Sequence, residues 1–244
     1  MLTSTHPTAL AQLQAELQEV SQQLEAAVAE LYPPLDYLAR GQLTQVRPLV
    51  RAAMALTAGV GAPDSPKLRT QRIMLAAALE MLHIAWRIHR LLLVGPINSD
   101  GDSNQRSITG SVILTGDYCF TRSAILAAQT DSVAVVAIFS QTLKQISEEI
   151  LRDLFQHNEA MAVPGEVTAF NENRALLHAG IEASAILAAL PVASIEPLYA
   201  FAGQVAQALT LSPPAALTEP TLVALTDEQQ ARWHALQQWL HTEQ

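Results

Sequence analysis

Four arginines on two neighbouring segments have the residue type and spacing to bind an anion. Arg87 and Arg90 are three residues apart, so an α-helix would place them on one face. Guanidinium groups match phosphate oxygens in shape and charge. With Arg47 and Arg51 upstream, the pair could therefore bind a diphosphate group without a metal ion. The alternative is that Arg87 and Arg90 are surface or interface arginines.

The histidines and carboxylates make a poor metal site. His83 and His89 are six residues apart, which puts them about 120° apart around a helix. Asp100 and Asp102 lie in a polar stretch that we expect to be a solvated loop. Cys119 is the one cysteine and lies among apolar residues, so we expect inert packing and no disulfide. His83 fits either a packed, hydrogen-bonded core residue or a contact to a ligand.

Helices must position these residues, because composition and periodicity both favour an all-α fold. Half of the residues are hydrophobic, only 15% are charged, and no alternating run is long enough for a sheet. We expect a single bundle of about eight to ten helices. The expected helical segments are 8–31, 35–56, 68–94, 111–128, 131–155, 167–189, 196–211 and a last helix after Thr226. We expect Thr8 to cap the first helix and Pro33-Pro34 to end it. Thr226 and Gln229 have the spacing of a capping box for the last helix.

The charge balance and the apolar runs limit the partners and the compartment. The chain has 14 Lys and Arg against 23 Asp and Glu, which makes it a poor candidate for nucleic-acid binding. Charged or amide residues interrupt every apolar run before the roughly 20 residues that a bilayer requires. The N-terminus lacks the pattern of a signal peptide. We expect a cytoplasmic protein without a transmembrane segment, folded as one domain over residues 1–244.

Three segments, in this order along the chain, resemble signatures of the trans-isoprenyl diphosphate synthases, or polyprenyl synthetases. Residues 46–49, Val-Arg-Pro-Leu, are similar to an Arg-Pro-Leu signature. Residues 79–83, Leu-Glu-Met-Leu-His, with His89 six residues on, resemble the helix that introduces the family's first aspartate-rich motif. Residues 113–118, Ile-Leu-Thr-Gly-Asp-Tyr, are similar to a helix start, so Asp117 would be a structural residue there. The resemblance covers about residues 35–212 and implies the all-α isoprenoid-synthase fold, shortened at its C-terminus.

The chemistry that the resemblance implies needs Mg²⁺. An allylic diphosphate ionises, and two aspartate clusters hold the metal ions that stabilise the departing diphosphate. This sequence departs from that pattern at both clusters. Arg90 and Leu91 stand at the first aspartate pair, Val94 stands at the third aspartate, and Pro213 and Pro214 fall on the second cluster. We therefore expect no Mg²⁺ ligands, no cofactor and no prenyl transfer by this chain alone.

Part of the family's substrate site is nevertheless expected. Arg47 and His83 match positions that the resembling family uses to hold isopentenyl diphosphate. Arg90 replaces an aspartate by a group that attracts phosphate. Arg47, His83 and Arg90 therefore form the expected vestigial diphosphate pocket.

Three functions fit this pattern. The first is a non-catalytic regulatory or small subunit of a heterodimeric isoprenyl diphosphate synthase, a role that chains without the aspartate motifs have in the resembling family. It would form a homodimer, or a heterodimer with a catalytic paralogue, through the apolar stripe of residues 10–31 and the helix from Leu68. The others are an isoprenoid- or lipid-binding protein that uses the fold's apolar cavity, and an enzyme of altered, metal-independent diphosphate chemistry.

Overall fold

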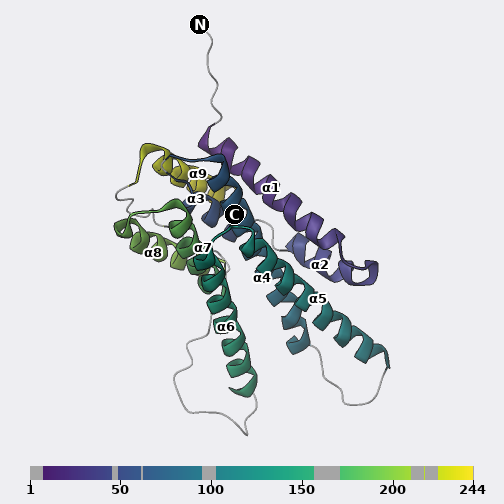
Figure 1. Cartoon of the computed structure of the whole chain (residues 1–244). Helices are drawn as coiled ribbons and strands as arrows, with labels where there is room; N and C mark the ends of the chain where they lie inside the picture. The colour runs from purple at the N-terminus through teal and green to yellow at the C-terminus, as the bar shows by residue number, and fades with distance from the viewer. Residues whose placement is uncertain are drawn as a thin grey trace.

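In the part of the chain that it describes, the computed structural model of this protein is built from α-helices alone (Figure 1). The described residues are 8–45, 49–61, 63–94, 103–156, 171–209, 217 and 225–243. The prediction of an all-α fold is confirmed, and none of the helices in these ranges is long and apolar enough to cross a membrane. The helices are α1 (Ala9–Ala29), α2 (Pro33–Gln45), α3 (Val50–Ala58), α4 (Pro66–Val94), α5 (Ser103–Ala128), α6 (Val133–Gln156), α7 (Glu172–Ala188), α8 (Val192–Ala208) and α9 (Asp227–Glu243).

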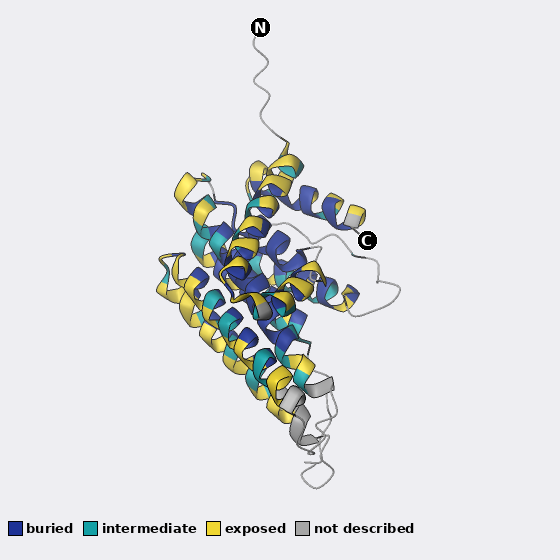
Figure 2. Cartoon of the chain, turned by 90° about the vertical axis from the view of Figure 1, so that its right-hand side faces the viewer, coloured by how far each residue is buried: buried dark blue, intermediate teal, exposed yellow. Residues whose placement is uncertain are grey.

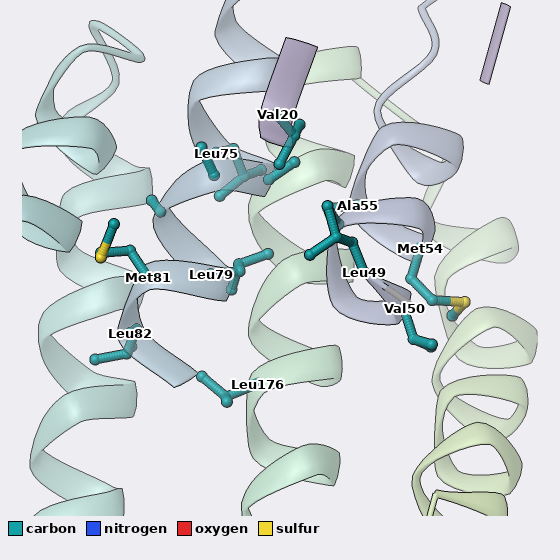
Figure 3. Packing of buried hydrophobic residues seen from close by; sticks show 14 of the residues in the cluster. Val20, Leu49, Val50, Met54, Ala55, Leu75, Leu79, Met81, Leu82 and Leu176 are labelled. Atoms are coloured by element: carbon teal, nitrogen blue, oxygen red, sulfur yellow. The ribbon is translucent and has the colours of Figure 1, made fainter. Parts of the chain in front are cut away.

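Helix α4 is the central element of the fold. It runs along α5 over most of its length and also contacts α1, α2, α3 and α7. Leu75, Leu79 and Ile84 of α4 are fully buried, and burial of each such side chain contributes about 1.5–3 kcal/mol. Figure 3 shows Leu79 in the core with Met54 of α3 and Leu176 of α7. Figure 2 shows that buried residues fill the middle of the molecule.

The apolar stripe of the first helix is buried inside the chain itself. Thr8 caps α1 as predicted, since its Oγ1 accepts a hydrogen bond from the Ala11 N–H at 3.2 Å. Leu13, Val20 and Leu24 are fully buried, and α1 packs against α4 and α9. Because the chain's own core covers this stripe, the expectation that it faces a partner subunit is not supported.

Two prolines begin a helix where only a break was expected. Pro33 and Pro34 follow the end of α1 but are also the first residues of α2. Proline is tolerated in the first turn, where its missing N–H has no helical partner to lose. The apolar segment 35–56 is therefore not one helix: it is divided between α2 and α3.

Two expected loops are shorter than predicted. Ser103 already belongs to α5, so the second half of the polar stretch 95–110 is helical, and 95–102 lie outside the described residues. Likewise α8 begins at Val192 and includes Pro197. The turn before it is made by Ala189, whose φ of 49° is left-handed. Polar or proline-containing composition predicted loops at both segments, but residues 106–109 near the start of α5 are exposed, so polar side chains are compatible with a helix there.

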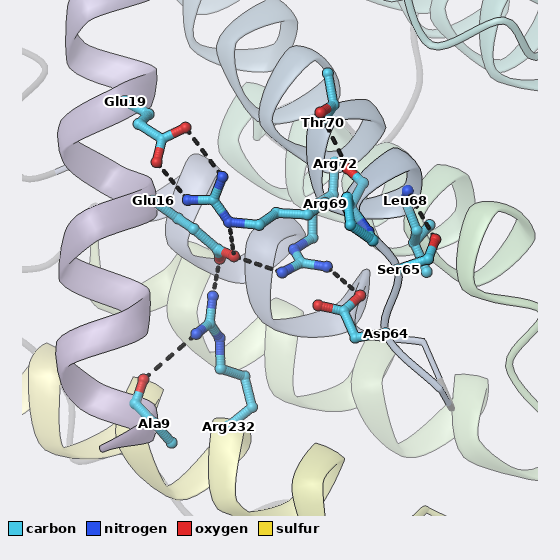
Figure 4. Close-up of polar contacts among 11 residues, drawn as sticks. Ala9, Glu16, Glu19, Asp64, Ser65, Leu68, Arg69, Thr70, Arg72 and Arg232 are labelled. Atoms are coloured by element: carbon cyan, nitrogen blue, oxygen red, sulfur yellow. Dashed lines mark hydrogen bonds and ion pairs between the residues drawn. The ribbon is translucent and has the colours of Figure 1, made fainter. Parts of the chain in front are cut away.

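A buried carboxylate ties three helices together at one end of α4. Glu16 of α1 forms ion pairs with Arg72 of α4 and Arg232 of α9, and all three side chains are at least nine-tenths buried. Arg69 adds a longer contact, 3.4 Å from its Nε to Glu16 Oε1. Asp64 pairs with Arg72 from the other side (Figure 4). Burial lowers the pKa of Arg232 to about 10, so it remains charged at pH 7.

The last helix begins with the predicted capping box. The Thr226 N–H donates to Gln229 Oε1 at 2.9 Å, and the Gln229 N–H donates to Thr226 Oγ1 at 3.4 Å. Gln229 also reaches back to the core, because its Nε2 donates to the Val60 carbonyl at 2.8 Å. These bonds fix where α9 starts and so where Arg232 meets Glu16.

Candidate functional site

A buried network of Arg51, Glu80 and Asn173 joins α3, α4 and α7. Arg51 Nε donates to Glu80 Oε2 at 3.0 Å, and Arg51 Nη1 donates to Asn173 Oδ1 at 2.7 Å. The other carboxylate oxygen of Glu80 accepts the Ala52 N–H at 2.9 Å. Arg51 and Glu80 are almost completely buried. The glutamate of the Leu-Glu-x-x-His segment is therefore fully engaged in holding the helices together.

Arg87, two turns further along α4, has neutral hydrogen-bond partners among the described residues. Its Nε donates to Gln42 Oε1 at 2.7 Å and its Nη2 donates to Gln45 Oε1 at 2.6 Å, both from α2. Amide oxygens orient a guanidinium without cancelling its charge. In the described part of the chain, no carboxylate lies within ion-pair distance of Arg87. Burial, followed by the charges of Arg51 and Arg90, lowers the pKa of Arg87.

Arg90 lies over an aromatic ring on the same face of α4. Its Cζ is 5.3 Å from the centre of the Trp86 ring, a cation–π contact that contributes about 0.5–1 kcal/mol at exposed sites. Its Nη1 is 3.6 Å from Glu172 Oε1 at the start of α7, and 53% of its side chain is exposed. Trp86 therefore positions the Arg90 guanidinium while leaving it open to solvent.

His83 is buried, neutral and incompletely hydrogen-bonded. Its pKa lies well below 6.5, first because of burial and then because of the nearby charges of Arg51, Arg87 and Arg90. Its Nδ1 has no hydrogen-bond partner among the described residues, and the same holds for the buried Nε1 of Trp86. His83 is thus a packed residue, as one alternative predicted, but not a fully hydrogen-bonded one.

Two of the three residues of the expected diphosphate pocket lie in the described part of the chain. His83 and Arg90 lie on one face of α4, whereas Arg47 lies outside the described residues. Arg87 joins them, which the spacing of the two α4 arginines had already suggested. Sequence reasoning missed Gln42 and Gln45, because nothing in their spacing shows that they face α4.

The histidine of one resembling segment packs against the glycine of another. A Cβ on Gly116 would lie 2.2 Å from His89 Nε2, so any other residue at this crossing of α4 and α5 would require the His89 ring to move. His89 Nε2 is 3.3 Å from Asp117 Oδ1, and the His89 ring lies 4.9 Å from that of Phe120. The expectation that Asp117 starts a helix is wrong, since α5 begins at Ser103.

The residues that the structure describes here do not fit Mg²⁺. This ion requires oxygen ligands, whereas the guanidinium of Arg90 offers only donors and Leu91 offers no polar atom. No three His, Cys, Asp or Glu side chains in the described ranges are placed to hold a metal ion. Asp100, Asp102 and residues 213–214 lie outside those ranges.

The cysteine is inert packing, as predicted. Cys119 is fully buried in α5 against the core. Burial raises the pKa of its thiol to about 12, so the reactive thiolate is not formed at neutral pH.

We expect His83 to make the fold less stable as the pH falls below 6.5. The unfolded chain takes up a proton on His83 near pH 6.5, whereas the folded protein does so only at much lower pH. The stabilisation is therefore complete above pH 6.5 and is lost toward the folded pKa, by up to about 1.4 kcal/mol per pH unit. Urea unfolding at pH 7.5, 6.5 and 5.5 measures it.

The free energy of unfolding of His83→Gln should fall less steeply with decreasing pH than that of the wild type. Replacement of the exposed His234 of α9 should leave this pH dependence as it is in the wild type. Equal slopes for the wild type and His83→Gln would contradict this account of His83.

Comparison with known proteins agrees with the fold and with the resemblance. No family model matches the sequence. The sequence is 22% identical to a prenyl transferase of Cyanidium caldarium over 182 residues. The matched region covers 73% of this chain and 56% of that relative. The chain thus spans little more than half the length of that relative.

Solved structures define the class of fold as that of the isoprenoid synthases. A polyprenyl synthase from Caulobacter crescentus, solved with calcium and isoprenyl diphosphate, superimposes with a TM-score of 0.63 and 20% identity, over 82% of this chain and 62% of that one. An isoprenoid synthase family member from Thermotoga neapolitana gives a TM-score of 0.61 and 16% identity over 93% and 91%. The resemblance of this chain to the trans-isoprenyl diphosphate synthases is confirmed.

Proposed function

We propose that this protein is a non-catalytic, polyprenyl synthase-like chain that acts as the regulatory or small subunit of a heterodimeric isoprenyl diphosphate synthase. The observation that carries the proposal is the position of Arg90. A guanidinium fixed over Trp86 lies on the helix face where the resembling family places a metal-binding aspartate. Such a group attracts diphosphate but cannot hold the metal ion that neutralises a leaving group. The proposal treats residues 1–244 as one domain.

The partner surface in this proposal is the outer face of α5 and the start of α6. Leu114 and Ile125 are eleven residues apart, about three turns, so they share a face of α5. Val133 follows at the start of α6 and is 87% exposed. Exposed apolar side chains at this density favour a protein partner. The exposed apolar residues of the two helices are Ile108, Ile113, Leu114, Ile125, Val133, Val136 and Leu151.

Co-expression of the tagged chain with the catalytic prenyl synthase of the same organism tests the pairing. We expect the two chains to co-purify as a stable complex. Leu114→Glu places a charge in the proposed interface and should weaken the complex at least tenfold, because an unpaired buried charge is costly. Leu209→Glu is the matched control, since Leu209 is an exposed apolar residue at the end of α8, a helix that packs against α7.

Sedimentation of the isolated chain completes the test. A homodimer that exchanges for the heterodimer when the synthase is added would agree with the proposal. A 26.3 kDa monomer that stays unchanged when the synthase is added would overturn it.

A further inference from the structure

We propose that Asp117, on the outer face of α5, receives a lysine or arginine side chain of the partner chain and so selects a partner with a positive charge at that point. This inference rests on the proposed function, because it takes the outer face of α5 and the start of α6 as the partner surface. It adds the charge that the partner must supply and the residue of this chain that requires it.

Asp117 lies among the apolar residues of this surface. It follows Leu114 by three residues, which places the two side chains within about 60° of each other around α5. Leu114 is 61% exposed, and so is the side chain of Asp117. Ile113, next to Leu114, is also exposed. A partner that covers Leu114 therefore covers the Asp117 carboxylate as well.

The carboxylate is poorly paired within its own chain. In the part of the chain that the structure describes, its one ion-pair partner is His89, whose Nε2 is 3.3 Å from Asp117 Oδ1. The same Nε2 is 3.4 Å from the Ile113 carbonyl oxygen, and a ring nitrogen carries at most one hydrogen, so two acceptors share it. The Thr121 hydroxyl, one turn further on, donates to the Asp117 backbone carbonyl at 2.9 Å and not to the carboxylate. Asp117 thus keeps acceptor capacity for a partner.

The position of the carboxylate is set before any partner binds. The His89 ring packs at Gly116, where an added Cβ would lie 2.2 Å from His89 Nε2, and the His89 side chain is only 21% exposed. The ring that contacts Asp117 is therefore held between α4 and α5. A carboxylate next to such a fixed contact loses little freedom when it binds, which favours affinity.

Burial of Asp117 in an interface requires a positive charge from the other side. Removal of a carboxylate from water is costly unless an opposite charge hydrogen-bonds to it. A guanidinium or an ammonium group supplies both the charge and the N–H donors. A partner with an apolar or acidic side chain at this point would be rejected. The net charge of −9 of the whole chain also favours a basic partner surface.

A second copy of this chain is poorly equipped to supply that charge. Helices α5 and α6 have four cationic side chains in the described ranges, and three of them already pair with carboxylates of their own chain: Arg122, Lys144 and Arg152. The fourth, Arg106, lies eleven residues before Asp117, about three turns along α5. The charges of this face therefore favour a different chain as the partner.

The affinity of this chain for the catalytic prenyl synthase of the same organism, measured by biolayer interferometry, tests the inference. We expect Asp117→Asn, which keeps the shape but loses the charge, to weaken binding about tenfold or more. Asp117→Glu keeps the charge and should stay within about threefold of the wild type. The difference between the wild type and Asp117→Asn should shrink at high salt, because salt screens an interfacial charge pair that is not fully buried.

Asp227→Asn is the matched control, since Asp227 is an exposed aspartate of α9, which packs against α1 and α3. It should bind as the wild type does. Wild-type binding that Asp117→Asn leaves unchanged, while Leu114→Glu still weakens it, overturns this inference and leaves the proposed function standing. No binding of the wild-type chain overturns the proposed function and this inference with it. Self-association that Asp117→Asn and Arg106→Gln weaken equally would assign the carboxylate to a second copy and also overturn the inference.

Discussion

Replacement of Glu16 by Gln is expected to lower the free energy of unfolding by about 3–5 kcal/mol. Glu16 is the shared partner of Arg72 and Arg232, and all three side chains are buried. A neutral amide accepts hydrogen bonds, but it leaves Arg72 paired with Asp64 and leaves Arg232 buried without a carboxylate partner among the described residues. Chemical denaturation of the wild type and Glu16→Gln at pH 7 measures the difference.

Glu19→Gln is the matched control for this prediction. Glu19 pairs with Arg69 one turn along α1, but 42% of its side chain is exposed, and exposed pairs contribute about 0–1 kcal/mol. We expect the loss of unfolding free energy in Glu16→Gln to be at least three times that in Glu19→Gln. Similar small losses from both would mean that Glu16 does not tie α1, α4 and α9 together.

The sequence contains a signal for the buried position of Glu16. Glu16 is three residues after Leu13 and four before Val20, so helical spacing puts it on the buried face of the first helix. A carboxylate on an apolar face predicts a buried cationic partner. The sequence could not identify that partner, because Arg72 and Arg232 come from distant helices whose packing angle sets the contact.

Helix starts were predicted correctly where a capping side chain bonds the backbone of its own helix. The Thr8 cap and the Thr226–Gln229 capping box formed as predicted. The helix from Leu68 also formed, since its apolar residues suit a central position. The prediction was wrong at Pro33 and Val192, because a proline that ends one helix can also lie in the first turn of the next.

The candidate site was predicted by residue type but not by its contacts. The α4 arginines were recognised as possible phosphate ligands. Arg51 was predicted to bind the same ligand, but in the structure its guanidinium donates hydrogen bonds to Glu80 and Asn173. That difference depends on the distance between α3, α4 and α7, which no pattern in one segment specifies.

We expect the purified chain to have almost no prenyl-transfer activity by itself. The purified chain, given Mg²⁺ and both an allylic diphosphate and isopentenyl diphosphate, should form no elongated product above about 0.1% of the rate of a catalytic synthase. Metal ions and fixed charges that stabilise a leaving diphosphate contribute several kcal/mol, and each 1.4 kcal/mol is tenfold in rate. Arg90 and Leu91 supply no metal ligand.

A radiolabelled-product assay measures this, with the catalytic synthase, purified in the same way, as the positive control. Mg²⁺-dependent elongation by this chain alone, at a rate near that of the control, would be incompatible with the loss of the metal site.

Product length from the reconstituted pair tests the central claim most directly. The catalytic synthase is assayed alone, with an equimolar amount of this chain, and with the Leu114→Glu variant, and the chain length of the products is compared by chromatography. We predict that the wild-type chain changes the product length or the rate of the synthase and that Leu114→Glu does not. A product distribution and rate that stay the same at saturating wild-type chain would contradict a regulatory-subunit function.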